Sequence, residues 1–177
     1  GANGRVKSVV FDGTCVHNNA KTGFGAVAGT CEGTISDCVF KGRINTTGVL
    51  NMGTYYNVCS AVGSMAGILK GGLVENCRLE GSVSEINENG RSLGGMVGIM
   101  EGGTVRNCSV IQSADVYCRS YNVGGIVGHL VEGTVEGCSV DARVNSGRSY
   151  VGGIIGKMSC GTVRGCAVSS YASVSTY

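Results

Sequence analysis

One unit of sequence recurs five times along this chain and constrains its fold more than any other feature. The three clearest copies have a hydrophobic residue, a run of the form Gly-Gly-aliphatic-aliphatic-Gly and, about ten residues later, a cysteine in a Gly-Thr-Val context; the first two copies are more degenerate. The copies start near Phe24, Val62, Leu93, Val123 and Val151, and residues 4–21 form a half-unit before them. A unit of this size buries its hydrophobic side chains only by stacking on its neighbours. The sequence therefore predicts a single repeat domain over residues 1–177.

Each unit reads as a set of short strands. In Cys138–Val144 apolar or small residues take every second place, which is the pattern of a strand with one buried face. We expect an all-β fold with about three short strands per unit, at Gly125–Leu130, Thr134–Glu136 and Cys138–Val144. Equivalent strands would pair in parallel, giving a β-solenoid (β-helix) of about five and a half coils. The alternative, a propeller, needs about 40 residues per blade, whereas the last two copies start only 28 residues apart.

Composition sets further limits on function. The chain has 14 Lys and Arg against 12 Asp and Glu, a net charge of +2, so no polyanion-binding surface is implied and no nucleic-acid partner is expected. It has 32 glycines and no proline, which suits tight corners between strands that need every backbone N–H. No stretch approaches the roughly 18 apolar residues of a membrane span, so we expect no membrane insertion. We interpret the abrupt start at Gly1 as that of a segment or mature form, with flanking repeats or domains in a longer protein.

The cysteines follow the repeat. Five of the ten take the same place in successive units, and they predict a stack of buried thiols: Cys38, Cys77, Cys108, Cys138 and Cys166. The other five are the better candidates for disulfides: Cys15, Cys31, Cys59, Cys118 and Cys160. No Cys-x-x-Cys pair occurs, so we predict no metal site.

Two sets of charged residues also repeat. Glu75, Arg106, Glu136 and Arg164 share one outward position with alternating sign, so stacking would pair each with its neighbour. Glu32, Glu101 and Glu132 precede the Gly-Thr step. We interpret these three as solvated corner residues; the alternative is an acidic ridge that binds a cation weakly.

The glycine-aliphatic core resembles the GLUG-motif repeat family. The matching residues are Gly95–Gly98, Gly125–Gly128 and Gly153–Gly156, while Ala26–Gly29 and Ser64–Gly67 lack the first glycine. The resemblance implies a bacterial extracellular or cell-surface protein, either adhesin-like or the non-catalytic region of a secreted peptidase. It carries over no catalytic residues, because the motif glycines and aliphatics are structural.

Nothing in the sequence predicts catalysis or a cofactor. Solenoid enzymes that cleave polysaccharides place several carboxylates on adjacent coils of one face. Asp12, Asp37, Asp115 and Asp141 share no outward stack, and no nucleophile elbow, zinc-protease or phosphate-loop motif is present. We therefore predict that the chain is not an enzyme.

The candidate binding residues are aromatic and basic. One group lies in the longest insertion and the other precedes the fourth and fifth copies: Tyr55, Tyr56 and Asn57, then Arg119, Tyr121, Arg148 and Tyr150. Such residues suit contacts with a glycan or with a host or cell-surface protein; packing at repeat corners explains them equally well. We expect a non-catalytic structural or adhesive repeat region of an exported bacterial surface protein, located outside the cell or on its surface. The alternative is an accessory region of a secreted peptidase or polysaccharide-degrading enzyme whose catalytic domain lies outside this chain.

Overall fold

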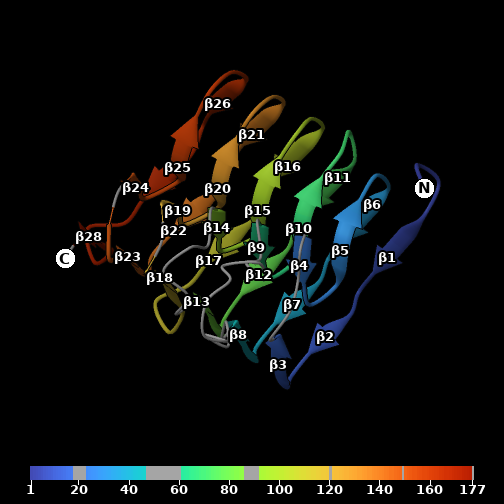
Figure 1. Cartoon of the computed structure of the whole chain (residues 1–177). Helices are drawn as coiled ribbons and strands as arrows, with labels where there is room; N and C mark the ends of the chain where they lie inside the picture. Colours follow the sequence, from blue (N-terminus) through green and yellow to red (C-terminus); the bar gives the residue numbers. More distant parts are fainter. Residues whose placement is uncertain (18–22, 47–60, 86–91, 120, 149, 177) are drawn as a thin grey trace, which may run out of the picture.

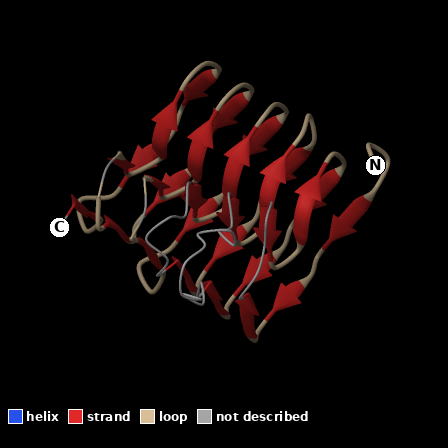
Figure 2. Ribbon diagram, in the orientation of Figure 1, coloured by secondary structure: helices blue, strands red, loops and turns tan. Residues whose placement is uncertain are grey.

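The computed structural model of this chain consists of short parallel strands that stack in register (Figures 1 and 2). It describes residues 1–17, 23–46, 61–85, 92–119, 121–148 and 150–176. The chain passes through five sheets in a fixed order and then returns to the first, one coil higher. The fold is thus an all-β solenoid, with five complete coils and three strands of a sixth among the described residues.

Sheets 1, 2 and 3 each have six strands. Sheet 1 contains β1 (Arg5–Lys7), β6 (Thr34–Ser36), β11 (Leu73–Glu75), β16 (Thr104–Arg106), β21 (Thr134–Glu136) and β26 (Thr162–Arg164). Sheet 2 contains β2 (Val10–Phe11), β7 (Val39–Phe40), β12 (Arg78–Leu79), β17 (Ser109–Val110), β22 (Ser139–Val140) and β27 (Ala167–Val168). Sheet 3 contains β3 (Thr14–His17), β8 (Arg43–Thr46), β13 (Ser82–Glu85), β18 (Asp115–Cys118), β23 (Arg143–Ser146) and β28 (Ser173–Thr176).

Sheets 4 and 5 each have five strands. Sheet 4 contains β4 (Gly23–Gly25), β9 (Ala61–Gly63), β14 (Ser92–Gly94), β19 (Asn122–Gly124) and β24 (Val151–Gly152). Sheet 5 contains β5 (Ala28–Cys31), β10 (Ala66–Leu69), β15 (Val97–Met100), β20 (Val127–Leu130) and β25 (Ile155–Met158). The five repeat starts lie in one column of sheet 4, in the order Phe24, Val62, Leu93, Val123 and Val151.

The expected number of strands per coil was too low. Each complete coil has five strands rather than about three, because the expected strand Cys138–Val144 contains a corner and a further strand, β19, precedes the expected strand Gly125–Leu130. The predicted strand Cys138–Val144 divides into β22 and the start of β23, yet its alternation continues through the corner. Val140, Ala142 and Val144 are all 2% exposed or less. A period-two pattern therefore does not reveal a corner that keeps the same residues pointing inward.

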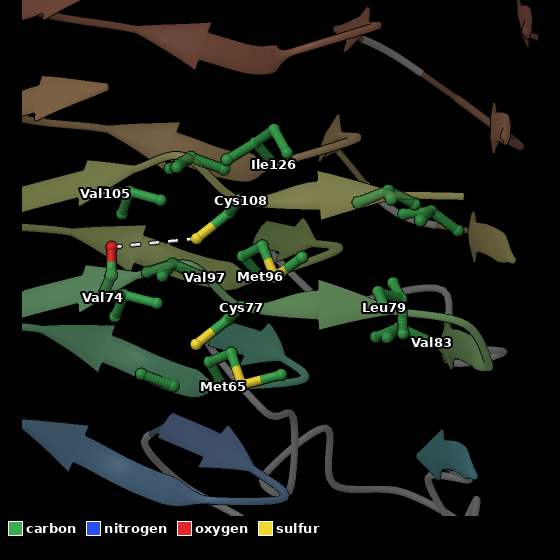
Figure 3. Close-up of a cluster of buried hydrophobic side chains, with 14 of the residues drawn as sticks. Met65, Val74, Cys77, Leu79, Val83, Met96, Val97, Val105, Cys108 and Ile126 are labelled. Atoms are coloured by element: carbon green, nitrogen blue, oxygen red, sulfur yellow. Dashed lines mark hydrogen bonds between the residues drawn. The ribbon is translucent and has the colours of Figure 1, made fainter. Parts of the chain in front are cut away.

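Aliphatic columns running along the solenoid fill the core. Figure 3 shows Val74 beside Val105 and Met65 beside Met96, each pair contributed by successive coils. Valines and leucines of sheets 2 and 3 form the facing columns, including Leu79. An isolated coil would leave these side chains open to solvent above and below it, so the core forms only when the coils stack.

The cysteine stack is confirmed for four of its five members, whereas Cys166, in the last coil, is only half-buried. Cys38, Cys77, Cys108 and Cys138 are 1% exposed or less, and each thiol contacts a backbone carbonyl. The Cys108 thiol donates to the carbonyl oxygens of Arg106 (3.3 Å) and of Val74 in the coil below (3.8 Å; Figure 3). Hydrogen bonds to the neighbouring cysteine thiols, together with burial, raise the pKa of Cys108 well above its usual value. These residues are small buried hydrophobes with a satisfied thiol.

No disulfide is present among the described cysteines. Of the predicted candidates, Cys31 and Cys118 are buried thiols, Cys15 is half-buried and Cys160 is exposed. Cys59 lies outside the described residues.

The alternating charge column is also confirmed. Glu75, Arg106, Glu136 and Arg164 are register partners on successive strands of sheet 1. Arg106 pairs with Glu75 at 2.6 Å and Arg164 with Glu136 at 2.5 Å. The acidic ridge does not form as a column, because Lys70 lies between Glu32 and Glu101 and pairs with the latter at 3.6 Å.

The motif glycines hold sheets 4 and 5 together. A Cβ on Gly128 would lie 2.6 Å from the backbone nitrogen of Leu93, the residue that starts the preceding copy. Gly156 makes the same approach to Val123, at 2.5 Å. Only glycine allows two backbones to come this close, so the last glycine of each motif joins its coil to the one below.

Candidate functional site

The coils differ in length mainly at one corner, between sheet 3 and sheet 4. Connections elsewhere in the coil span two to four residues. At this corner the connecting segments are residues 18–22, 47–60, 86–91, 119–121 and 147–150. We call the described residues at this corner, namely Arg119, Tyr121, Gly147, Arg148, Tyr150 and the strand ends that flank them, the variable corner. In a solenoid, insertions map to loops on one side, where binding surfaces often lie.

Four predicted binding residues lie here. Arg119, Tyr121, Arg148 and Tyr150 are all exposed, with 43% of Tyr121 and 62% of Tyr150 accessible. The guanidinium carbon of Arg148 lies 6.0 Å from the centre of the Tyr121 ring, which belongs to the coil below. Its Nη1 donates a hydrogen bond of 3.5 Å to the Tyr121 hydroxyl. Basic and aromatic side chains of adjacent coils therefore contact one another.

The other three predicted residues, Tyr55, Tyr56 and Asn57, lie outside the described residues.

The backbone of Tyr150 is unusual. Its φ is +48°, in the left-handed region that non-glycine residues seldom adopt. The other described non-glycine residues with positive φ share one column, at the turn between sheets 1 and 2: Ser8, Asp37, Asn76 and Asn107. Asn and Asp tolerate this conformation, whereas it costs an aromatic residue more. The backbone at Tyr150 is anchored, because its carbonyl oxygen accepts a hydrogen bond from Val123 N (3.0 Å).

Buried polar side chains collect beneath this corner. The structure buries eight polar or charged residues among those described, and six of them lie at or beside the ends of sheet 3 and the start of sheet 4: Thr46, Glu85, Ser92, Asn122, Asn145 and Ser146. Asn122 Nδ2 donates to Ser92 Oγ at 3.1 Å across two coils of sheet 4. The variable corner is thus the polar edge of an otherwise apolar core.

Glu85 is the ionisable member of this group. It is 1% exposed and stacks between Thr46 and Cys118 in sheet 3. Its Oε2 accepts a hydrogen bond of 3.6 Å from the Cys118 thiol, while its Oε1 has no partner among the described residues. Desolvation by burial raises the pKa of Glu85 to about 8, against a smaller lowering from the Cys118 contact. The carboxyl group is therefore mostly neutral at pH 7.

Glu85 was not predicted, although the sequence contains a signal for it. Glu85 follows Val83 by two residues in β13, so alternation places both on the inward face. The same period-two pattern that predicts the buried valines therefore also predicts a buried acid at this position.

A second group of charges lies where sheet 2 meets sheet 3. A shallow groove there is lined by Lys41, Glu80, Ser82 and Asp115, among others. Glu80 is paired with Arg78 and, at 3.9 Å, with Lys41.

The described residues contain no cluster of three or more His, Cys, Asp or Glu side chains that could hold a metal ion. No helix long and apolar enough to cross a membrane occurs in the described part of the chain.

Comparison with protein families links this geometry to a known repeat. Residues 119–145 match the GLUG motif. The match begins at Arg119 in the variable corner and runs through β19, β20, β21 and β22 to Asn145 in β23. One GLUG motif thus corresponds to one coil of the solenoid. Comparisons with curated proteins and with solved structures give no match.

Proposed function

We propose that this chain is a non-catalytic, adhesive repeat region of an exported bacterial surface protein, and that it contacts a glycan or another protein through the variable corner. The observation that carries the proposal is that the regular and the variable residues of each coil have different roles. The regular residues are used for stacking: glycines join sheets 4 and 5, cysteines fill the core and charges pair along sheet 1. Where the coils vary in length, the exposed residues that the structure describes are aromatic and basic.

The rigidity of the scaffold suits this role. Every strand of an inner coil is paired on both edges, so the corner residues project from a backbone fixed by hydrogen bonds. Binding residues placed on such a scaffold lose little conformational entropy when a ligand binds. Exposed tyrosines add rigid contact area with both apolar and polar character.

The carboxylates on the outer face support a structural role. Glu75 and Glu136 occupy one column of sheet 1, but Arg106 lies between them and Glu75 is held in an ion pair. Glycoside cleavage needs an acid and a base or nucleophile placed on either side of one bond. Ion-paired carboxylates on a flat strand face provide a stacking register instead.

The test is a binding survey with the whole chain. The chain would be labelled and applied to arrays of glycans and of cell-surface proteins, and bound material would be assayed for cleavage. Saturable binding that is lost when Tyr121 and Tyr150 are both replaced by alanine would support adhesion. Turnover of a bound glycan would refute the non-catalytic assignment, and saturable binding to no member of either array would refute adhesion.

A further inference from the structure

Five cysteine thiols form a single file through the core, away from the variable corner. They occupy one position in successive coils, just after the strands of sheet 1: Cys38, Cys77, Cys108, Cys138 and Cys166. Register partners beside this position, such as Glu75 and Arg106, fix its alignment from coil to coil. All five are free thiols. We call these five residues the thiol column.

The thiols of the column share one side-chain conformation. Each sulfur lies between 3.2 and 3.5 Å from the carbonyl oxygen two residues earlier in its own coil. The last four also lie 3.8 Å from a carbonyl oxygen of the coil below. Because these surroundings repeat, successive sulfur atoms are separated by the distance between coils, about 4.8 Å. Figure 3 shows the Cys77 and Cys108 thiols pointing the same way, one coil apart.

Neighbouring thiols also interact with one another. Hydrogen bonding with the Cys108 thiol is the largest cause that lowers the pKa of Cys77 and the pKa of Cys138, while burial acts against it at both. Cys108 is thus linked to the thiol above it and to the thiol below it. The column is therefore a line of sulfur atoms with one exchangeable proton on each.

This spacing suits an ion that takes two sulfur ligands in a straight line. An ion midway between neighbouring sulfurs would lie about 2.4 Å from each, close to the roughly 2.3 Å of a zinc–thiolate bond. Zinc itself takes four ligands, and the described residues contain no group of three His, Cys, Asp or Glu side chains that could hold one ion. The missing Cys-x-x-Cys spacing, from which we predicted no metal site, concerns such four-ligand ions. Thiolates also select Cu(I), a soft ion that accepts two ligands.

The charge of Cu(I) suits the apolar core as well. An ion in such a core carries a large desolvation cost unless its charge is neutralised. Each Cu(I) that enters displaces one thiol proton to solvent, so that the ion and the thiolate cancel. Five thiols leave four gaps; four ions would displace four protons, and one sulfur would keep its proton. The filled column would then be as neutral as the empty one.

We propose that the thiol column binds Cu(I), with each ion held in line between the sulfur atoms of two successive coils. The proposal concerns the core of the solenoid and does not depend on the adhesive function proposed above. Four of the thiols are 1% exposed or less, so ions reach them only when the coils open locally. Loading should therefore be slow in the native chain and fast when the chain refolds in the presence of the ion.

The test counts bound ions by native mass spectrometry. The reduced whole chain would be refolded from urea with Cu(I) under anaerobic conditions, and separately with Ag(I), a soft monovalent ion that air does not oxidise. Excess glutathione would then remove ions held by single thiols. We expect four retained ions per chain, one for each gap in the column. X-ray absorption at the copper edge should show two sulfur neighbours per ion.

Variants distinguish a bridged column from separate thiols. Cys108→Ala interrupts the column at its centre, so it should lose two of the four ions although it removes only one thiol. Cys31→Ala is the matched control, because it removes a buried thiol of sheet 5 outside the column, and it should retain all four. Cys166→Ala, at a half-buried position in the last coil, should fold readily and lose one ion.

The outcomes are distinct from those for adhesion. Graded losses in the three variants, with two sulfur neighbours per ion, would support the thiol column as a Cu(I) site. Retention of no ion after the glutathione wash would overturn it. Equal losses in Cys108→Ala and Cys31→Ala, three or four sulfur neighbours per ion, or retention of Zn(II) as firmly as Ag(I) would overturn it as well. A chain that binds a glycan or a protein but retains no ion would leave the adhesive function intact.

Discussion

The buried carboxyl group of Glu85 should make the stability of this protein fall as the pH rises. In the folded chain burial raises the pKa of Glu85 to about 8, from a usual value of 4.5. Between these two pH values the folded state binds one more proton than the unfolded state. Folding stability therefore decreases as the pH rises through this interval. Below and above it, Glu85 causes no change of stability with pH.

The size of this loss of stability follows from the difference between the pKa of Glu85 in the folded and in the unfolded chain. Each pKa unit corresponds to about 1.36 kcal/mol, so the loss between pH 4.5 and pH 8 is on the order of 5 kcal/mol. Glu85 is 1% exposed, so solvent screening reduces this little. A domain is typically stable by about 5–15 kcal/mol, so one ionisation would remove a large share. Because Glu85 lies beneath the variable corner, local opening there should precede global unfolding.

The assay is urea denaturation followed by circular dichroism, at several pH values from about 4.5 to 9, which span the titration of Glu85. Glu85→Gln removes the titration while keeping the shape of the side chain, so its stability should vary much less over this range. At the alkaline end the variant should be more stable than the parent, and at the acidic end it should be equal or less stable, because its amide buries extra N–H groups. Glu132→Gln, at a glutamate that is not buried in the core, is the control and should keep the parent's pH dependence.

A local measurement sharpens the test. The Arg119 amide donates to the carbonyl oxygen of Glu85, so at a pH of about 8.5 its hydrogen exchange should be faster in the parent than in Glu85→Gln, measured under identical conditions. The reasoning would be refuted if the parent and Glu85→Gln lost stability equally between about pH 5 and pH 8. Such a result would mean that the Glu85 carboxyl group is solvated or paired in the folded state.

Three further predictions concern the stacking that holds the solenoid together. Gly98→Ala should cost about 2–4 kcal/mol in chemical denaturation, because its Cβ would meet the backbone of the coil below; a loss below about 0.5 kcal/mol would contradict the close approach. Cys108→Ala should cost about 1 kcal/mol by the same measurement, since it removes one small buried group from the core, and labelling of Cys108 itself by a thiol reagent should be slow in the native parent and fast in urea, in contrast to the exposed Cys160. Arg106→Glu should cost about 1 kcal/mol in low salt and less in about 1 M salt, because it places a third acid between Glu75 and Glu136 on an exposed strand face; a loss that does not depend on salt would show that the column is not held by charge.

The repeat alone was enough to predict the class of fold. Alternating residues after each cysteine predicted strands, and the recurrence of a unit too short for a propeller blade predicted stacked coils with parallel pairing, because such units bury their apolar residues only against their neighbours. The positions of Cys108 and of Arg106 followed from the same logic: residues at one place in the repeat must become neighbours along the stack. These features are local or periodic, so they are readable in the sequence.

The tertiary structure decided what happens at the corners. It showed five strands per coil. The sequence did not reveal the corner between Val140 and Val144, because the alternation of inward-facing residues continues through it. It also placed Glu85 beneath the variable corner, next to Cys118 of the following coil, and this contact joins residues from different repeats. The raised pKa of Glu85 and the pairing of Arg148 with Tyr121 depend on the distance between coils and on exclusion of water. Both depend on how the coils pack, and the sequence of one repeat does not determine that packing.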